Sequence, residues 1–138
     1  MMLLALALSL VVAQPAIPQT PDHAAIVRRF VDAFNARDIA AMLALATDDV
    51  EWASVDGVKV TVETAGKEAL RASMTSYFKS CPTCRSTVDI KAVTANRAVA
   101  IETASWTAAS GPRSQHGLSV YEFKDGHIRR VYYYPVER

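Results

Sequence analysis

IVRRFVDAFNARD, the stretch from Ile26 to Asp38, decides the fold. Its apolar residues recur every three or four positions with charged residues between them, which predicts an amphipathic helix with one buried face. Asp22 precedes the pattern and is placed to cap this helix, which we expect to end at residues 35–37. Asp38 then caps a second, shorter helix over residues 39–45.

The segments after these helices predict short strands joined by turns, and then a third helix. Residues 47–49 are expected to close the second helix. Gly66 interrupts the extended pattern, and apolar residues beyond it return to helical spacing. The expected elements are a strand at 50–54, a turn at 56–57, a strand or extended loop at 59–63 and a helix at 67–79.

The remainder of the chain is rich in strands. Runs of β-branched and aromatic residues alternate with polar ones and are separated by turn signals. Helices grouped first and a meander grouped last favour an α+β fold, with three N-terminal helices packed on a strongly curved, mostly antiparallel sheet. Such a sheet leaves a concave mouth, the usual place for a small-molecule site. The expected strands are 88–95, 98–108, 118–123 and 127–134, with a loop at 110–112.

Residues 1–13 (MMLLALALSLVVA) carry no charged side chain and stand apart from the rest. The run is shorter than the ~20 apolar residues that span a bilayer, and it suits a secretory signal peptide cut near Ala13. Residues 14–21, with three prolines, are then a linker, and residues 22–138 the mature domain. An uncleaved anchor and a misassigned start are the alternatives. The expected location is periplasmic or secreted, without stable membrane insertion.

Charge and motif content exclude several classes of function. The 138 residues include 15 Lys and Arg and 14 Asp and Glu, which gives a net charge of +1. No basic block is present to grip phosphates, so a nucleic-acid partner is not expected. No phosphate-binding glycine loop, HExxH pattern or Ser-His-Asp order stands out, and the sequence predicts no cofactor and no metal site.

The two cysteines lie close together, as Cys81-Pro82-Thr83-Cys84. A local disulfide suits an exported protein and is the first interpretation; free thiols are the second. A redox-active pair needs its first cysteine at a helix N-terminus, whereas this motif follows a helix. A zinc site needs more than two ligands, and no histidine lies near in the sequence.

Three segments carry a resemblance to a known family. The start of the chain resembles the start of nuclear transport factor 2-like domains in its opening helix, in MLAL at 42–45 and in DDVEW at 48–52. It is most similar to the SnoaL-like and ketosteroid-isomerase-like branch of that family. YEFKDGHI at 121–128 is similar to the last hairpin of that family, and GKEAL at 66–70 to the start of its third helix. The resemblance covers essentially the whole mature chain. It implies a cone-shaped fold but no single activity, because this fold hosts isomerases, cyclases, dehydratases and binding domains.

The resemblance also allows a test for isomerase chemistry. That mechanism uses a carboxylate base and an oxyanion hole built from a tyrosine and a protonated aspartic acid. The positions that match these groups hold Phe30, Ser54 and, at or near the third, Ser119. None of these side chains supplies the required group, so the isomerase mechanism is not expected.

Strand parity predicts which side chains line the mouth, because alternate residues of a strand share one face. The resulting lining is aromatic with a few hydroxyl groups, which suits a small apolar or aromatic molecule. Aromatic side chains also serve commonly as plain core, which is the alternative. The expected ligand-binding residues are Phe30, Trp52, Ser54, Tyr77, Ser119, Tyr121 and Tyr133.

Two residues are weak candidates for acid/base chemistry. His116 has the side chain best suited to proton transfer near neutral pH, but parity turns it away from the mouth. Glu102 lies among alanines and threonines of a central-looking strand. It is either an acid within the pocket or an outward group paired with an arginine.

The last strand carries arginine and tyrosines on its expected outer face, a composition typical of interfaces. We expect a homodimer through this sheet face, as is common in the family that the chain resembles. The alternative is a monomer whose tyrosines pack on their own sheet. The expected interface residues are Trp106, Arg130, Tyr132 and Tyr134.

The sequence is compatible with three functions. The first is an exported domain that binds a small apolar molecule without catalysis. The second is an enzyme of isomerase, dehydratase or cyclase type that uses Glu102 or His116. The third is a dimerisation or partner-binding module whose cone is filled by its own side chains. The positions of Glu102 and His116 relative to a cavity discriminate among them.

Overall fold

The computed structural model describes residues 13–16 and 21–135. Most of the expected signal peptide (1–13) and half of the expected linker (14–21) lie outside the described residues. The longest described helix has 14 residues, so none of the described helices can span a bilayer. The elements are α1 (His23–Asn35), α2 (Ile39–Ala44), β1 (Ala46–Asp56), β2 (Lys59–Ala65), α3 (Lys67–Ser80), β3 (Arg85–Val93), β4 (Arg97–Ala108), β5 (Gly111–Lys124) and β6 (His127–Tyr134).

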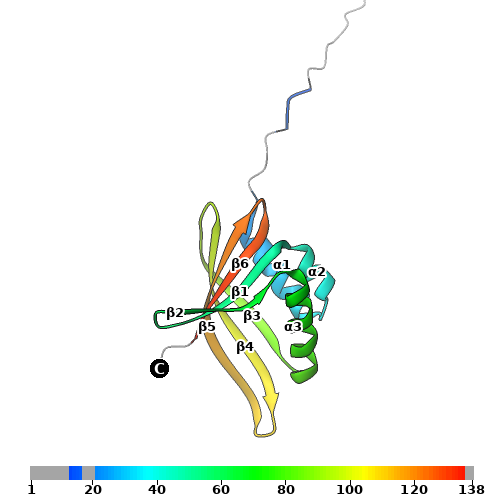
Figure 1. Cartoon of the computed structure of the whole chain (residues 1–138), viewed down its shortest axis with the longest axis vertical. Coiled ribbons are helices and arrows are strands. Elements are labelled where there is room, and N and C mark those ends of the chain that lie inside the picture. The colour runs from blue at the N-terminus through cyan, green and yellow to red at the C-terminus, as the bar shows by residue number, and fades with distance from the viewer. Residues whose placement is uncertain (1–12, 17–20, 136–138) are drawn as a thin grey trace, which may run out of the picture.

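The strands form one sheet in the order β2-β1-β6-β5-β4-β3. Strands β3 to β6 are an antiparallel meander, and β1 pairs antiparallel with β2 but parallel with β6. Figure 1 shows the sheet curling beside the three helices, with the β4–β5 hairpin reaching past them. This is the α+β cone with three helices packed on a curved sheet that the sequence predicts.

Side-chain caps fix the starts of α1 and α2 at the aspartates expected from the sequence. The Asp22 carboxylate accepts a hydrogen bond from the Ala25 N–H at 3.1 Å, and the Asp38 carboxylate accepts one from the Ala41 N–H at 2.9 Å. Each cap satisfies a backbone N–H that the first helical turn leaves without a partner. Between the helices, Arg37 adopts a left-handed φ of 60°, so the chain turns sharply there.

Strand β1 begins earlier than the sequence predicts. Residues 47–49 were expected to close the second helix, but they belong to β1, which starts at Ala46. Ala46 pairs with Ile128 of β6, and the Ile128 N–H donates to the Leu45 carbonyl at 2.9 Å. The neighbouring strand, rather than local composition, therefore sets the start of β1.

Strand β5 is also longer than expected. It begins at Gly111, so the loop predicted at residues 110–112 is wrong beyond residue 110. Residues 111–117 pair with the end of β4, from Glu102 to Ala108. The two strands together make the long hairpin seen in Figure 1. This hairpin extends one wall of the cone.

The hydrophobic core fills the space between the helices and the concave face of the sheet. Apolar side chains from all three helices meet those of β1, β4, β5 and β6 there. Burial of this apolar surface is the main force that holds the helices against the sheet. The largest of the fully buried side chains are Val27, Met42, Leu70, Ser119, Tyr121, Ile128 and Val131.

Gly66 joins β2 to α3 in a backbone conformation that only glycine adopts readily. Its φ of 90° and ψ of 157° lie outside the regions open to residues with a Cβ. Gly66→Ala should therefore lower the free energy of unfolding by about 1–3 kcal/mol. Urea unfolding followed by circular dichroism measures the change. Ala65→Ser, at the exposed neighbour, is the control and should stay within about 0.5 kcal/mol. Equal stability of the two variants would contradict the prediction.

Candidate functional site

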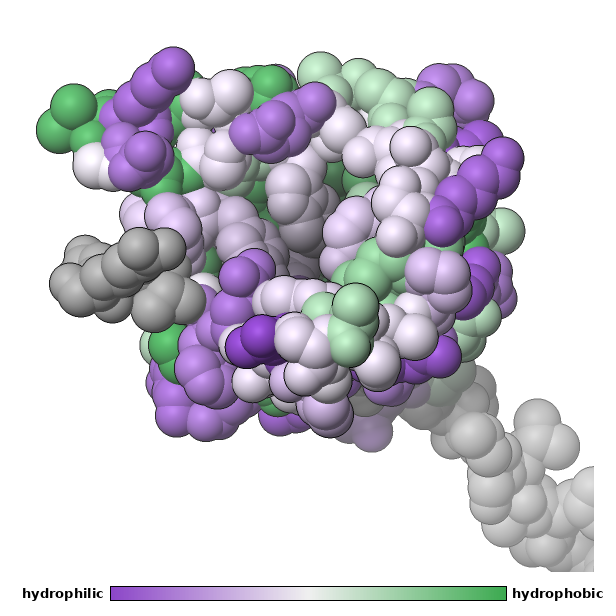
Figure 2. Space-filling view, turned by 90° about the horizontal axis from the view of Figure 1, so that it is seen from below, coloured by the Kyte–Doolittle hydropathy of each residue, from purple (hydrophilic) through white to green (hydrophobic). Residues whose placement is uncertain are grey.

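A cavity opens between the helices and the concave face of the sheet. It has an inner part of about 280 Å³ and an outer part of about 570 Å³. Figure 2 looks into the hollow from below, with hydrophobic residues visible in its depth and hydrophilic ones along its rim. Four residues line both parts and so mark their junction: Glu102, Ala104, Gln115 and Tyr133.

Three aromatic rings from different elements form one wall of the inner part. Phe30 of α1 lies 5.9 Å from Trp52 of β1, and Trp52 lies 6.2 Å from Tyr133 of β6, measured between ring centroids. The rings are close to parallel, at 27° and 24°. Trp52 and Tyr133 meet because β1 and β6 are neighbours and both side chains project from the concave face. The row lines the cavity without filling it and offers flat apolar surfaces to a ligand.

Glu102 places a carboxylate at the junction of the two parts, with only 7% of the residue exposed. The Ser86 hydroxyl donates to its Oε1 at 2.8 Å, and the Tyr121 hydroxyl donates to its Oε2 at 3.1 Å. Among the described residues, no lysine or arginine forms an ion pair with it. Of the two interpretations drawn from the sequence, the structure therefore has the inward carboxylate and not the outward one paired with arginine.

The last residue of α1 holds Ser86 in place. The Asn35 side-chain Nδ2 donates to the Ser86 carbonyl at 2.8 Å, and the Asn35 Oδ1 accepts from the Ser86 N–H at 2.8 Å. The amide group thus pairs with the start of β3 much as a neighbouring strand would. It fixes the backbone from which the Ser86 hydroxyl reaches Glu102.

A disulfide and contacts from Arg37 hold the segment between α3 and β3, beside the cavity wall. Cys81 and Cys84 are joined by a disulfide, with 5.4 Å between their Cα atoms. The Arg37 Nη2 donates to the carbonyls of Pro82 and Cys84 at 2.8 and 2.7 Å. The guanidinium carbon of Arg37 also lies 4.5 Å from the ring centroid of Phe78, within the range of a cation–π contact.

Burial raises the pKa of the two tyrosines nearest Glu102. The pKa of Tyr121 is well above its ordinary value, first because the ring is fully buried and second because the Glu102 carboxylate is close. The same two causes, in the same order, raise the pKa of Tyr133. Both phenols therefore keep their protons at neutral pH and can donate hydrogen bonds.

The structure brings part of the expected ligand-binding set to the cavity. Tyr121 and Ser119 are fully buried and do not line it, although Tyr121 contacts Glu102, which does. Ser54 lines neither part; its hydroxyl donates at 2.5 Å to the carboxylate of Glu63, which does line the inner part. The expected residues that do line the inner part are Phe30, Trp52, Tyr77 and Tyr133.

His116 and Trp106 lie on opposite faces of the β4–β5 hairpin. His116 borders the outer part of the cavity, but its Nδ1 is 2.8 Å from the Thr103 Oγ1 on the exposed face, so its imidazole turns away as parity predicts. Trp106 shares the parity of Glu102 along β4, which has no register shift against β5. The expected place of Trp106 on the outer face beside Tyr132 is therefore wrong, because its side chain belongs to the concave side.

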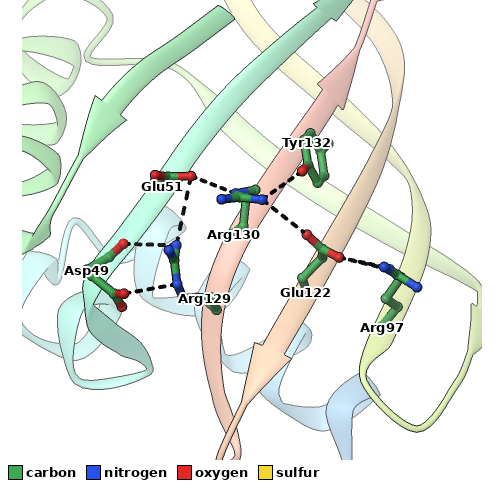
Figure 3. A network of polar contacts seen from close by, with 7 residues as sticks. All are labelled: Asp49, Glu51, Arg97, Glu122, Arg129, Arg130 and Tyr132. Atoms are coloured by element: carbon green, nitrogen blue, oxygen red, sulfur yellow. Dashed lines mark hydrogen bonds and ion pairs between the residues drawn. The ribbon is translucent and has the colours of Figure 1, made fainter. Parts of the chain in front are cut away.

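Ion pairs cross the outer face of the sheet (Figure 3). The Arg130 Nε lies 2.6 Å from the Glu51 carboxylate, and its Nη1 donates to the Tyr132 hydroxyl at 2.9 Å. Arg130 and Tyr132, both expected at a dimer interface, thus have partners within the chain, while Tyr134 is 36% exposed. The ladder continues with Arg129–Asp49 at 3.1 Å and Arg97–Glu122 at 2.9 Å.

Sequence reasoning missed several polar residues that line the cavity, among them Arg85, Ser86 and Gln115. β3 was expected to begin at residue 88 and β5 at residue 118, so these positions fell outside the expected strands. Pairing of β3 and β5 with β4 is the signal that would have placed them. Within the described ranges, no three His, Cys, Asp or Glu side chains gather as a metal site requires.

Comparisons with known proteins agree on the fold. A family model described as a SnoaL-like domain matches residues 27–131. The chain is similar to a nuclear transport factor 2-like protein of unknown function from Burkholderia pseudomallei, at 22% identity over 82% of this chain and 89% of that one, with a TM-score of 0.67. It is also similar to a putative polyketide cyclase from Xanthomonas campestris, at 20% identity over 82% and 89%, with a TM-score of 0.63. A third similar structure is TerC co-crystallized with polyporic acid, at 16% identity over 82% and 90%, with a TM-score of 0.67. No curated protein matches the sequence.

Proposed function

The chain belongs to the SnoaL-like domain family, and on that premise we propose that its inner cavity binds a small molecule with an apolar, aromatic body. The observation that carries the proposal is the open inner cavity of about 280 Å³ walled by the row of Phe30, Trp52 and Tyr133. A concave, mainly apolar site with a few converging polar groups is the usual form of a small-molecule site.

The shape of the cavity favours binding over a filled, purely structural cone. Rings that fill a cone would leave no space beside them, whereas here they form a wall. The polar groups on the opposite side, Glu102 and Gln115, offer a ligand points of orientation. A similar structure, TerC, was co-crystallized with polyporic acid, so a related fold accommodates an organic ligand.

Enlarging Ala104 should block the cavity at the junction of its two parts. Ala104 lines both the inner and the outer part, so Ala104→Leu places three more carbon atoms at the junction. We expect the affinity for a bound aromatic molecule to fall at least about tenfold, because a filled site cannot accept the same ring. The probe is whichever member of a panel of indole, tryptophol, 2-phenylethanol, tryptamine and 2-phenylethylamine raises the melting temperature most, and calorimetry measures its Kd.

The matched control adds the same group outside the cavity. Ala72 is exposed on α3, and leucine is a good helix former, so Ala72→Leu should leave the Kd unchanged. Circular dichroism checks that both variants fold. Equal affinity in Ala104→Leu and wild type would place binding elsewhere. Absence of binding by the whole panel at millimolar concentration would count against the proposed function.

A second candidate function is proton transfer by Glu102, because its carboxylate faces the same cavity. An enzyme of isomerase, dehydratase or cyclase type needs such a group within reach of its substrate. Exchange of the acidic C–H of phenylacetone for deuterium in D2O is a direct assay. Catalysed exchange that drops by about 100-fold or more in Glu102→Gln would support the enzyme. Exchange no faster than in buffer would remove this candidate.

We also propose that two copies pair through the outer face of the sheet around Tyr134, Tyr132 and Arg130. Support comes from the exposed aromatic surface at Tyr134 beside the ladder of ion pairs. Light scattering on the purified protein measures the mass directly. Tyr132→Glu should convert a dimer to a monomer, since it would bring a third acid beside Glu51 and Glu122. A wild-type mass of one chain at micromolar concentration would contradict pairing.

We propose in addition that the protein is exported and cut near Ala13, to a periplasmic or secreted location. The apolar run at residues 1–13 suits an export signal. The Cys81–Cys84 disulfide suits an oxidising compartment. N-terminal sequencing of protein recovered from its native host measures the cut. A soluble cytoplasmic protein that still starts at Met1 would contradict export.

A further inference from the structure

The Glu102 carboxylate is the starting point for the chemical class of the ligand. It is 7% exposed, and both oxygens accept hydrogen bonds from neutral hydroxyls. A carboxylate removed from water is costly unless it is also paired with a cation. In the part of the chain that the structure describes, no lysine or arginine supplies that cation.

The other charged groups that line the cavity do not form an ion pair with Glu102. Arg85 lines the inner part, but its Nη1 donates to the Cys84 carbonyl at 2.8 Å and lies near the Pro82 carbonyl at 3.5 Å, so it serves the turn before β3. Glu63 of β2 adds a second carboxylate to the lining of the inner part. The outer part is lined by no lysine or arginine among the described residues. An anionic ligand would therefore meet two carboxylates, Glu102 and Glu63, against the single guanidinium of Arg85.

The aromatic wall adds a second, independent preference. The faces of tryptophan and tyrosine rings carry negative charge density and attract cations within about 6 Å of the ring centre. Trp52 and Tyr133 line the same inner part as Glu102, and Tyr77 completes this side of the cavity. A cation held at Glu102 would lie beside aromatic side chains as well as a carboxylate.

We propose that the ligand of this cavity carries a protonated amine, which pairs with Glu102 while its aromatic or cyclic apolar body lies against Trp52 and Tyr133. The inference rests on the proposed binding function and names the class of molecule that the site selects. The ammonium group brings to Glu102 a positive charge, together with hydrogen-bond donors, that its neutral hydroxyl partners do not supply. Neutral alcohols bring donors without the charge, and carboxylic acids bring the wrong charge.

The experiment compares two pairs of probes that differ only in that group. The pairs are tryptamine with tryptophol and 2-phenylethylamine with 2-phenylethanol, each titrated into the full protein by calorimetry at pH 7. We expect the amine of at least one pair to bind tenfold or more tightly than its alcohol. In Glu102→Gln, which keeps the size of the side chain, the ratio should fall to near one, mainly through weaker amine binding.

Glu68→Gln is the matched control, because the Glu68 side chain is 87% exposed on α3 and does not line the cavity. It should preserve the amine preference. Alcohols that bind as tightly as amines in wild type would overturn the amine inference and leave the proposed binding function standing. Failure of all four probes to bind would instead overturn the proposed function. If Glu102→Gln does not fold, the wild-type amine-to-alcohol ratio decides the inference alone.

Discussion

Replacing Phe30 with alanine is expected to lower the free energy of unfolding by about 3–5 kcal/mol. The ring is 3% exposed and packs against Trp52 at 5.9 Å and edge-on against Tyr121 at 6.4 Å. Its loss removes apolar burial and opens a void that the stiff sheet on one side cannot close. Urea unfolding monitored by circular dichroism measures the change.

Two further variants bracket this result. Phe30→Leu keeps most of the volume and should cost less than the alanine variant, because cores tolerate changes that conserve volume best. Val60→Ala on β2, where the side chain is 54% exposed, should stay within about 0.5 kcal/mol. A loss below about 1 kcal/mol in Phe30→Ala would mean that this ring does not support the core.

Raising the pH above 10 should destabilise the protein steeply. The pKa of Tyr121 and that of Tyr133 are raised in the folded state, chiefly by burial, from an ordinary value of 10.0. Above pH 10 the unfolded chain releases both phenol protons while the folded chain keeps them, so the unfolded state binds fewer protons. Stability is therefore intact below pH 10 and falls as the pH rises, by about 1.4 kcal/mol per pH unit for each tyrosine.

Urea unfolding at half-unit steps from pH 8 to 12 measures this slope. Tyr133→Phe is the informative variant, because it removes one raised phenol without removing the hydrogen bond from Tyr121 to Glu102. Its slope above pH 10 should be about 1.4 kcal/mol per unit shallower than that of wild type. A stability that is flat between pH 9 and pH 12 would show that these phenols ionise equally well in the folded chain.

The sequence predicts the helical part of this fold well because its signals are local. Spacing of apolar residues and the capping aspartates Asp22 and Asp38 act within a few positions of the chain. Parity also places Trp52, Tyr133 and the outer Arg130 on their correct faces, since alternation within a strand is local too. The concave-side position of Trp106 was not predicted. The expected β5 began at residue 118 and so left out the residues, 111–117, that pair with the end of β4.

The polar side of the cavity depends on contacts between distant residues and could not be predicted. Ser86 meets Glu102 because β3 pairs with β4, and Asn35, 51 positions away in the chain, also bonds the Ser86 backbone. The hydroxyl of Ser54 likewise bonds Glu63 on the next strand, a contact that the spacing within β1 does not predict. The parity of Glu102 itself stayed open, since a carboxylate among small residues suits either face of a sheet.

The parallel pairing of β1 with β6 has a consequence for how the chain folds. The β1–β2 hairpin joins the meander only through β6, which is the last strand in the chain order. Contacts between segments some 80 residues apart must therefore form before the cone closes, and such non-local contacts slow folding. During synthesis, the β1–β2 hairpin lacks its partner strand until β6 has left the ribosome. A chain with this topology can complete its sheet only after its last strand has been made.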